Sequence, residues 1–456
     1  TINARLSQDT TGINLTGEFH SYTKHNPNKF RAVINAFVHQ AAAGVHLDFF
    51  DARGRKGIDL GVKATAAEDG LQVSVFPETP VIAYRSFRIN GDNYVFLGRE
   101  HEVRADIDLL ADDGTAMSLL GEPTDSINDL TLSMLNVNLS ELSDVLPVMP
   151  RLGGMLSGDI HITAGRFEPS LSAAALVQTR ALEFEGALLG DLGVEAFYLP
   201  MADSAHYAHA YISAGDREVM QCEGTYSNDR FAGEAHIDGL PLQMANGFLV
   251  GTDFLLDGYA KGDLSLRQED DGMRIDGALA FDSAHVLSDV YGINLAMDTT
   301  TLVMADSRLL FDRFGLRSNG RGNPLEITGS LDLSQMDNMR MSLLMKAKNF
   351  ELVNTRRKMS SLLYGKVYAD FVGQLEGSAD AVTVKGKMDI LDRTDMTYIL
   401  KDSPLTVDDR LADLVRFVDL TDTARVEMDE AVAVGGFNMV LGISISDAAR
   451  FCCNLS

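Results

Sequence analysis

The chain has 456 residues, of which 45% are hydrophobic, which is enough for two or three globular domains or one extended repetitive domain and excludes wholesale disorder. Its 39 lysines and arginines face 65 aspartates and glutamates, and the formal net charge of −26 argues against a nucleic-acid-binding protein and against a partner of anionic lipid surfaces. Three cysteines are too few for a disulfide-built scaffold or a zinc ribbon.

Both ends of the sequence indicate a piece of something longer. The chain begins at Thr1 without an initiator Met or a signal peptide, and it stops abruptly after Ser456. No apolar run reaches the roughly 18 residues that a membrane-spanning helix requires. We therefore expect a mature or excised segment.

Apolar and polar residues alternate along much of the chain. Successive side chains of an extended strand point to opposite faces, so each alternating run predicts a strand with one apolar and one polar face. In one curled sheet, the apolar faces would together line a groove. The predicted lining residues are Val103, Ile107, Leu109, Leu130, Leu132, Met134, Ile160, Ile162, Leu264, Leu266, Met273, Ile275, Leu279, Phe281, Leu325, Ile327, Leu331, Leu333, Met341, Leu343, Met345, Val382, Val384, Met388 and Ile390.

Tight-turn signals separate these runs. Pairs such as Asp-Gly and Asn-Gly favour two-residue hairpin connections, so neighbouring strands should be antiparallel. Strands recur about every 12–16 residues, which predicts on the order of 30 strands. The turn signals are Asp69-Gly70, Asp113-Gly114, Gly215-Asp216-Arg217, Asp271-Gly272 and Asn319-Gly320.

Four short stretches carry apolar residues at helical spacing instead: 139–149, 240–249, 350–363 and 411–417. A related strand opening follows each of the first three. The sequence GMLSGDIHI at 154–162 is echoed by GYAKGDLSL at 258–266 and more weakly by GKVYADF at 365–371. These spacings predict a repeat of about 105 residues, each made of a short helix, a glycine-punctuated strand and a run of hairpins.

The predicted fold is all-β, with a long antiparallel-rich sheet curled into an open trough and short helices that cover the trough edge. A flat sheet of about 30 strands is outside the usual range, so the sheet must curl or split. The predicted organisation is an N-terminal portion of the sheet at 1–138, a first repeat at 139–239, a second at 240–349, and a third repeat with the start of the C-terminal part at 350–456.

No set of residues predicts catalysis, a cofactor or a metal site. His206, His209 and Cys222 invite a metal hypothesis, but His206 and His209 point to opposite faces if 206–212 is a strand. The acidic pair Asp112-Asp113 fits turn chemistry better than acid–base catalysis. Residues 356–358 (Arg-Arg-Lys) form a basic cluster, for which a solvated surface is favoured over contact with lipid phosphate or an acidic partner.

The order and spacing of these features resemble the TamB family of the AsmA-like superfamily, in the form found in Bacteroidota. The closest stretches are 323–332, 364–370, 391–400 and 443–451, and the likeness extends from about residue 80 to the end. The resemblance implies a lengthwise-folded sheet, called a β-taco, around an apolar groove. It also implies a periplasmic location, with an inner-membrane anchor in a segment absent from this chain.

The function that the resemblance implies is a bridge-like conduit that carries phospholipid between the inner and outer membranes. Such a conduit supports outer-membrane biogenesis and protein assembly, together with a BamA-type outer-membrane barrel partner (TamA-like or a lipoprotein homologue). Transport along an apolar groove requires no catalytic residue and no cofactor, and we expect no enzymatic activity and no nucleic-acid partner.

Two other classes remain open. Stacked β-sandwiches of an extracytoplasmic adhesion or binding module would also show hairpins and an acidic surface, and they would suit a period of about 105 residues. The short helices and the shortage of Pro/Ser linkers speak against them. An enzyme on a parallel β-helix would show coils of about 20–25 residues without hairpin turn signals, a pattern that this chain lacks.

Overall fold

The computed structural model describes residues 2–8, 12–21, 30–39, 42–146, 150–168, 170–201, 205–249, 253–270, 272–335, 338–357, 363–378, 381–400 and 437–455. Strands make up 77% of the structure and helices 4%, so the fold is all-β. Twenty-nine strands belong to one large, open, mostly antiparallel sheet, which confirms the predicted fold class. The chain divides into two compact units, residues 1–229 and 230–456, and the four predicted segments stay a prediction.

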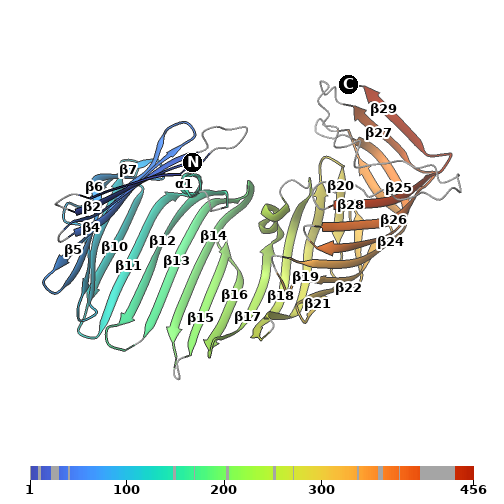
Figure 1. The fold of residues 1–456 in the computed structure, drawn as a ribbon. Coiled ribbons are helices and arrows are strands. Elements are labelled where there is room, and N and C mark those ends of the chain that lie inside the picture. Colours follow the sequence, from blue (N-terminus) through green and yellow to red (C-terminus); the bar gives the residue numbers. More distant parts are fainter. Residues whose placement is uncertain are drawn as a thin grey trace. The chain divides into compact units, whose positions relative to one another are not determined.

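The described residues of unit 1 form sixteen strands and one α-helix (Figure 1). These are β1 (Ile2–Gln8), β2 (Gly12–Ser21), β3 (Phe30–His39), β4 (Ala42–Asp51), β5 (Lys56–Ala67), β6 (Gly70–Ile82), β7 (Arg85–Ile89), β8 (Tyr94–Gly98), β9 (Val103–Ala111), β10 (Ala116–Pro123), β11 (Ile127–Asn138), α1 (Leu139–Val145), β12 (Leu152–Gly165), β13 (Leu171–Phe184), β14 (Ala187–Pro200), β15 (His206–Ala214) and β16 (Arg217–Ser227). Each strand pairs antiparallel with the next, except that β7 and β8 share one place between β6 and β9.

Unit 2 holds the remaining strands and a short 3₁₀ helix. These are β17 (Arg230–Pro241), η2 (Leu242–Leu249), β18 (Leu255–Glu269), β19 (Gly272–Ser288), β20 (Ile293–Met297), β21 (Leu302–Ala305), β22 (Arg308–Ser318), β23 (Leu325–Asp332), β24 (Arg340–Thr355), β25 (Leu363–Ser378), β26 (Ala381–Ile390), β27 (Asp395–Leu400), β28 (Phe437–Ile445) and β29 (Arg450–Leu455).

The predicted turn signals lie between antiparallel strands, as expected from Asp-Gly and Asn-Gly chemistry. They connect β5 to β6, β9 to β10, β15 to β16, β18 to β19 and β22 to β23. The antiparallel rule fails at the C-terminal edge, where β28 lies parallel to β26 and β29 parallel to β27. Parallel neighbours need a long connection rather than a hairpin, and residues 401–436 separate β27 from β28.

Helix α1 begins where the sequence predicts the first short helix. The side chain of Asn138 caps it by accepting hydrogen bonds from the N–H groups of Ser140 and Glu141. Val145 is buried against Phe49 of β4, a strand far from α1 in sequence. The sheet of unit 1 must therefore curve around the face that carries Phe49, so that α1 reaches it.

The second predicted helix corresponds to η2, but the third prediction is wrong over its first half. Residues 350–355 belong to β24. The strand bulges next to Asn349 and again between Glu351 and Val353, so that an extra residue separates the buried Phe350 and Val353. Bulges convert the two-residue period of a strand into the three-residue spacing of a helix. Residues 358–362 and the predicted helix at 411–417 lie outside the described residues.

Three bulges recur at the predicted repeat spacing. Asn136 in β11, Gly239 in β17 and Asn349 in β24 all have positive φ, and the strand pairing shifts at each of them. In the first two cases the strand ends within a few residues and a helix follows. A bulge increases local twist and bends the strand, so these positions favour curvature at one end of the strands.

The strand after each of these bulged strands has one position where only glycine fits without strain. Gly154, Gly258 and Gly365 have φ of 102°, 97° and 118°. A Cβ at these positions would lie 2.7, 2.4 and 2.2 Å from a backbone carbonyl oxygen of the neighbouring strand. The glycines of the repeated sequence therefore allow two strands to approach closely.

Replacing Gly258 by Ala should destabilise unit 2 by about 2 kcal/mol or more, because it combines a left-handed backbone with a collision against the carbonyl of Ser283. Gly91→Ala is the control, since no atom lies within 4 Å of a Cβ there, and its stability should change by about 0.5 kcal/mol or less. Urea unfolding of both variants checks this. Equal stability of the two variants would contradict the account of the repeat.

Candidate functional site

One face of the unit 1 sheet is apolar along its whole series of pairings. Directly paired residues share a face, so the pairing of Leu119 with Ile107 and Leu132 places all three side chains together. The same row continues through Ile160, Ala175, Ala196, Ala210 and Cys222. We call this side the apolar face and its opposite the polar face.

The apolar face extends to the first strands of the chain. Large apolar side chains there are exposed, with Leu6 and Val38 exposing 70% and 58% of their surface. All ten exposed large apolar residues of β1–β8 lie on the apolar face by strand pairing, and a single layer of strands carries them. Such a surface is far more apolar than a monomer in water normally tolerates. The ten are Leu6, Ile13, Leu15, Phe19, Ile34, Val38, Val45, Val62, Leu71 and Leu97.

The predicted lining residues of unit 1 all lie on the apolar face and are half-buried. They are Val103, Ile107, Leu109, Leu130, Leu132, Met134, Ile160 and Ile162. Sequence reasoning missed the equivalent residues of β1–β8, although the same alternation is present there, as in Ile13 and Leu15 or Ile34, Ala36 and Val38.

The predicted lining residues of unit 2 also share one face, by the pairings from β17 to β26. They are half-buried except Met273, which is exposed, and Ile390, which is buried. The set comprises Leu264, Leu266, Met273, Ile275, Leu279, Phe281, Leu325, Ile327, Leu331, Leu333, Met341, Leu343, Met345, Val382, Val384, Met388 and Ile390.

Part of the unit 2 apolar face is covered by its own side chains. Leu302, Met304, Leu309 and Phe314 form a buried cluster, against which other apolar residues of β18, β19 and β23 pack. A second cluster joins Leu295 of β20 to β24. The apolar face is therefore more enclosed in unit 2, and several predicted lining residues act there as core.

The polar face carries cross-strand pairs of His and carboxylate residues. His161 Nε2 lies 2.6 Å from Asp129 Oδ1, and His236 Nδ1 lies 2.6 Å from Asp263 Oδ1. Both pairs are exposed, so each contributes little to stability. They mark the solvent side of the sheet.

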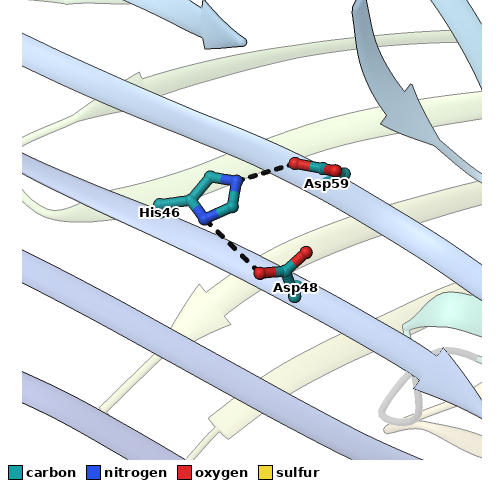
Figure 2. Close-up of side chains that lie close together, drawn as sticks. All are labelled: His46, Asp48 and Asp59. Carbon is teal, nitrogen blue, oxygen red and sulfur yellow. Dashed lines mark hydrogen bonds and ion pairs between the residues drawn. The ribbon is translucent and has the colours of Figure 1, made fainter.

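His46, Asp48 and Asp59 form the one group of described side chains that could converge on a metal ion (Figure 2). His46 lies 2.7 Å from Asp59 and 3.5 Å from Asp48. The ammonium group of Lys56, however, lies 2.9 Å from Asp48 and 2.6 Å from Asp59, between the two carboxylates. The lysine already neutralises the negative charge that a cation would need, so the group is a structural ion-pair network on the polar face.

Protonation in this network follows from its contacts. Burial on its own would raise the pKa of Asp59, but the hydrogen bonds from Lys56 and His46 outweigh it and lower the pKa. Hydrogen bonds to Asp59 and Asp48 raise the pKa of Lys56. The pair is therefore charged over the whole neutral range.

The other candidate residues do not assemble into a site. His206 and Cys222 lie on the apolar face, and His209 lies on the polar face, as the strand parity predicts. Burial raises the pKa of the Cys222 thiol, which makes it a poor ligand or nucleophile. Asp113 accepts a hydrogen bond from the N–H of Thr115, which is the turn role expected for it.

No protein-family model, curated protein or solved structure matches this chain. In the described part of the chain, no helix is long and apolar enough to cross a membrane.

Replacing Lys56 by Met should lower stability near neutral pH by about 1 kcal/mol or less, because Lys56 is partly exposed. A carboxyl with a lowered folded-state pKa stabilises the fold above its unfolded pKa of about 3.9, and this contribution disappears as pH falls through the folded pKa. The stability difference from wild type should therefore be constant above about pH 4 and shrink as the pH falls further below it.

Melting temperatures of both proteins between pH 3 and 7 measure this, with Lys63→Met on the same strand as the control. Lys63 forms no ion pair among the described residues, so its replacement should give no pH-dependent difference. A Lys56→Met deficit that persists unchanged at acid pH would refute the electrostatic interpretation.

Proposed function

We propose that the apolar face binds the acyl chains of phospholipids and carries them along the sheet between the inner and outer membranes. The observation that carries this proposal is the continuous register of apolar side chains from β1 to β16 on a single layer of strands. Exposed apolar surface on this scale needs an apolar partner.

Acyl chains suit this surface for physical reasons. Burial of each CH₂ group contributes about 0.8 kcal/mol, so a chain that lies on the apolar face is held without a directional contact. Neighbouring positions along the rows of Leu, Ile, Ala and Val offer nearly equal energies. A lipid can then shift from one position to the next without breaking hydrogen bonds, and no chemical step is needed.

The family resemblance supplies the setting of the proposal: a TamB-like protein of the periplasm, held at the inner membrane by a segment outside this chain. Its outer-membrane partner would be a BamA-type barrel protein. Stacked β-sandwiches, the other class suggested by the sequence, require two sheets packed face to face. The described strands of unit 1 form one layer, which favours the conduit.

Purified protein should carry phospholipid, because without it the exposed apolar side chains of β1–β8 would face water. Organic extraction followed by mass spectrometry measures the bound lipid. Delipidated protein should bind a fluorescent acyl probe in a saturable manner. The absence of both extractable lipid and probe binding would count decisively against an acyl-binding face.

Two residues of β14 give a matched test of which face binds. Val194 lies on the apolar face and Phe197 on the polar face, and they expose 37% and 36% of their surface. Because both sites are equally accessible to water, Val194→Asp and Phe197→Asp should both fold. A charge at 194 lies in the path of the acyl chains and should reduce probe binding at least several-fold, whereas a charge at 197 should not.

Melting curves establish that both variants are folded, and the transfer of labelled phospholipid between vesicles measures function. If both variants bind the probe and transfer lipid as well as wild type does, the apolar face is not the lipid path. Loss of binding in both variants with intact folding would move the site to a different surface.

A further inference from the structure

A cluster of lysines lies on the polar face of unit 2, on strands β24 and β26. Lys346 and Lys387 flank Val372 of β25, because both pair directly with that residue. Lys348 lies on the same side of β24, and Lys385 on the same side of β26. All four lysines are exposed, and Lys346, Lys348 and Lys387 line one shallow depression of about 640 Å³.

Glu326, Asp370 and Asp389 line the same depression, but only Asp389 forms an ion pair with one of these lysines among the described residues. Lys387 lies 3.0 Å from Asp389, but Lys346, Lys348 and Lys385 form no ion pair within the part of the chain that the structure describes. Glu326 is paired opposite Lys346 without an ion-pair contact. The ammonium groups are therefore available to an external anion.

The distribution of charge in the chain singles out this region. Seven of the twelve lysines lie between residues 346 and 401, and no lysine occurs from 64 to 260. Residues 340–401 contain 11 basic and 7 acidic residues, although the whole chain has a net charge of −26. In this acidic chain, the lysines are therefore most frequent on and next to strands β24–β26.

Exposed apolar side chains accompany the lysines. Val372 between Lys346 and Lys387 exposes 52% of its surface, and Leu344 and Val440 on the neighbouring strands expose 37% and 52%. Lysine ammonium groups next to exposed valine and leucine side chains suit the interface of a lipid bilayer. There the ammonium groups contact phosphate and the apolar side chains enter the headgroup layer.

We propose that this cluster, on the polar face of β24–β26, binds the surface of a membrane that contains anionic phospholipid. The net charge of the chain does not prevent this, because charges more than about 8 Å from the contact are largely screened at physiological ionic strength. The contact is made by the polar face with headgroups at a bilayer surface. It does not require that the opposite, apolar face bind acyl chains.

Sedimentation with vesicles tests the proposal on the full chain. Protein is mixed with vesicles of phosphatidylcholine alone or with added phosphatidylglycerol, at low and high salt. The variant K346E/K385E/K387E reverses three lysines of the cluster. The control R5E/K63E/R267E makes the same change in net charge at exposed positions outside it.

Wild type and control should bind the anionic vesicles, and binding should weaken as salt rises. Each lysine near an anionic surface contributes about 1 kcal/mol, so reversal of three should weaken binding on the order of a hundredfold or more. Melting curves confirm that both variants are folded.

Four results would overturn the proposal. Equal binding of wild type and the lysine variant, or equal loss in the control, would show that the cluster has no special role. Failure of wild type to bind anionic vesicles would exclude a membrane as the partner of the cluster and would favour an acidic protein instead. Salt-independent binding to phosphatidylcholine alone would assign membrane contact to the apolar face, and that result would leave the proposed function standing while this inference fails.

Discussion

Two residues that pair directly in a sheet lie on the same face. When the register pairs apolar residues with apolar residues on each successive pair of strands, one face of the whole sheet is therefore apolar. In unit 1 this rule acts across sixteen strands, between the bulges that shift the register locally. Leu15 is matched with Ala36, and the same logic links Leu119 to Ile160 far along the chain. Since a slip of one residue would turn a whole strand over, the apolar face requires every register to be correct.

A sheet with one apolar face needs either a second layer or curvature, and the structure uses curvature with small local covers. Helix α1 covers the end of β4 through Val145, and unit 2 encloses its cluster around Phe314. Bulges at Asn136 and Gly239 precede the two short helices, where strand bending is required. The uncovered remainder, above all in β1–β8, is what the proposed lipid partner would cover.

The pattern of alternation was sufficient to predict an all-β sheet, its hairpins and the shared face of residues such as Leu132 and Ile160. It failed at Phe350 and Val353, because two bulges create helical spacing inside a strand, and single-sequence patterns do not show where pairing shifts. The parallel placement of β28 could not be predicted, since it depends on which edge is free after a long connection. The lysine cluster was missed because Lys346 and Lys387 lie far apart in sequence and meet only through β25.

The central claim is that the acyl chains of bound phospholipid lie on the apolar face of unit 1 and not on its polar face. Adjacent residues of β10 test it directly, because Leu119 points to the apolar face and Leu120 to the polar face. A photo-crosslinking amino acid placed at either position, followed by irradiation of the lipid-loaded protein and mass spectrometry, reports which side contacts lipid. The account predicts a phospholipid adduct at position 119 and none at position 120, and adducts at both positions or at 120 alone would contradict it.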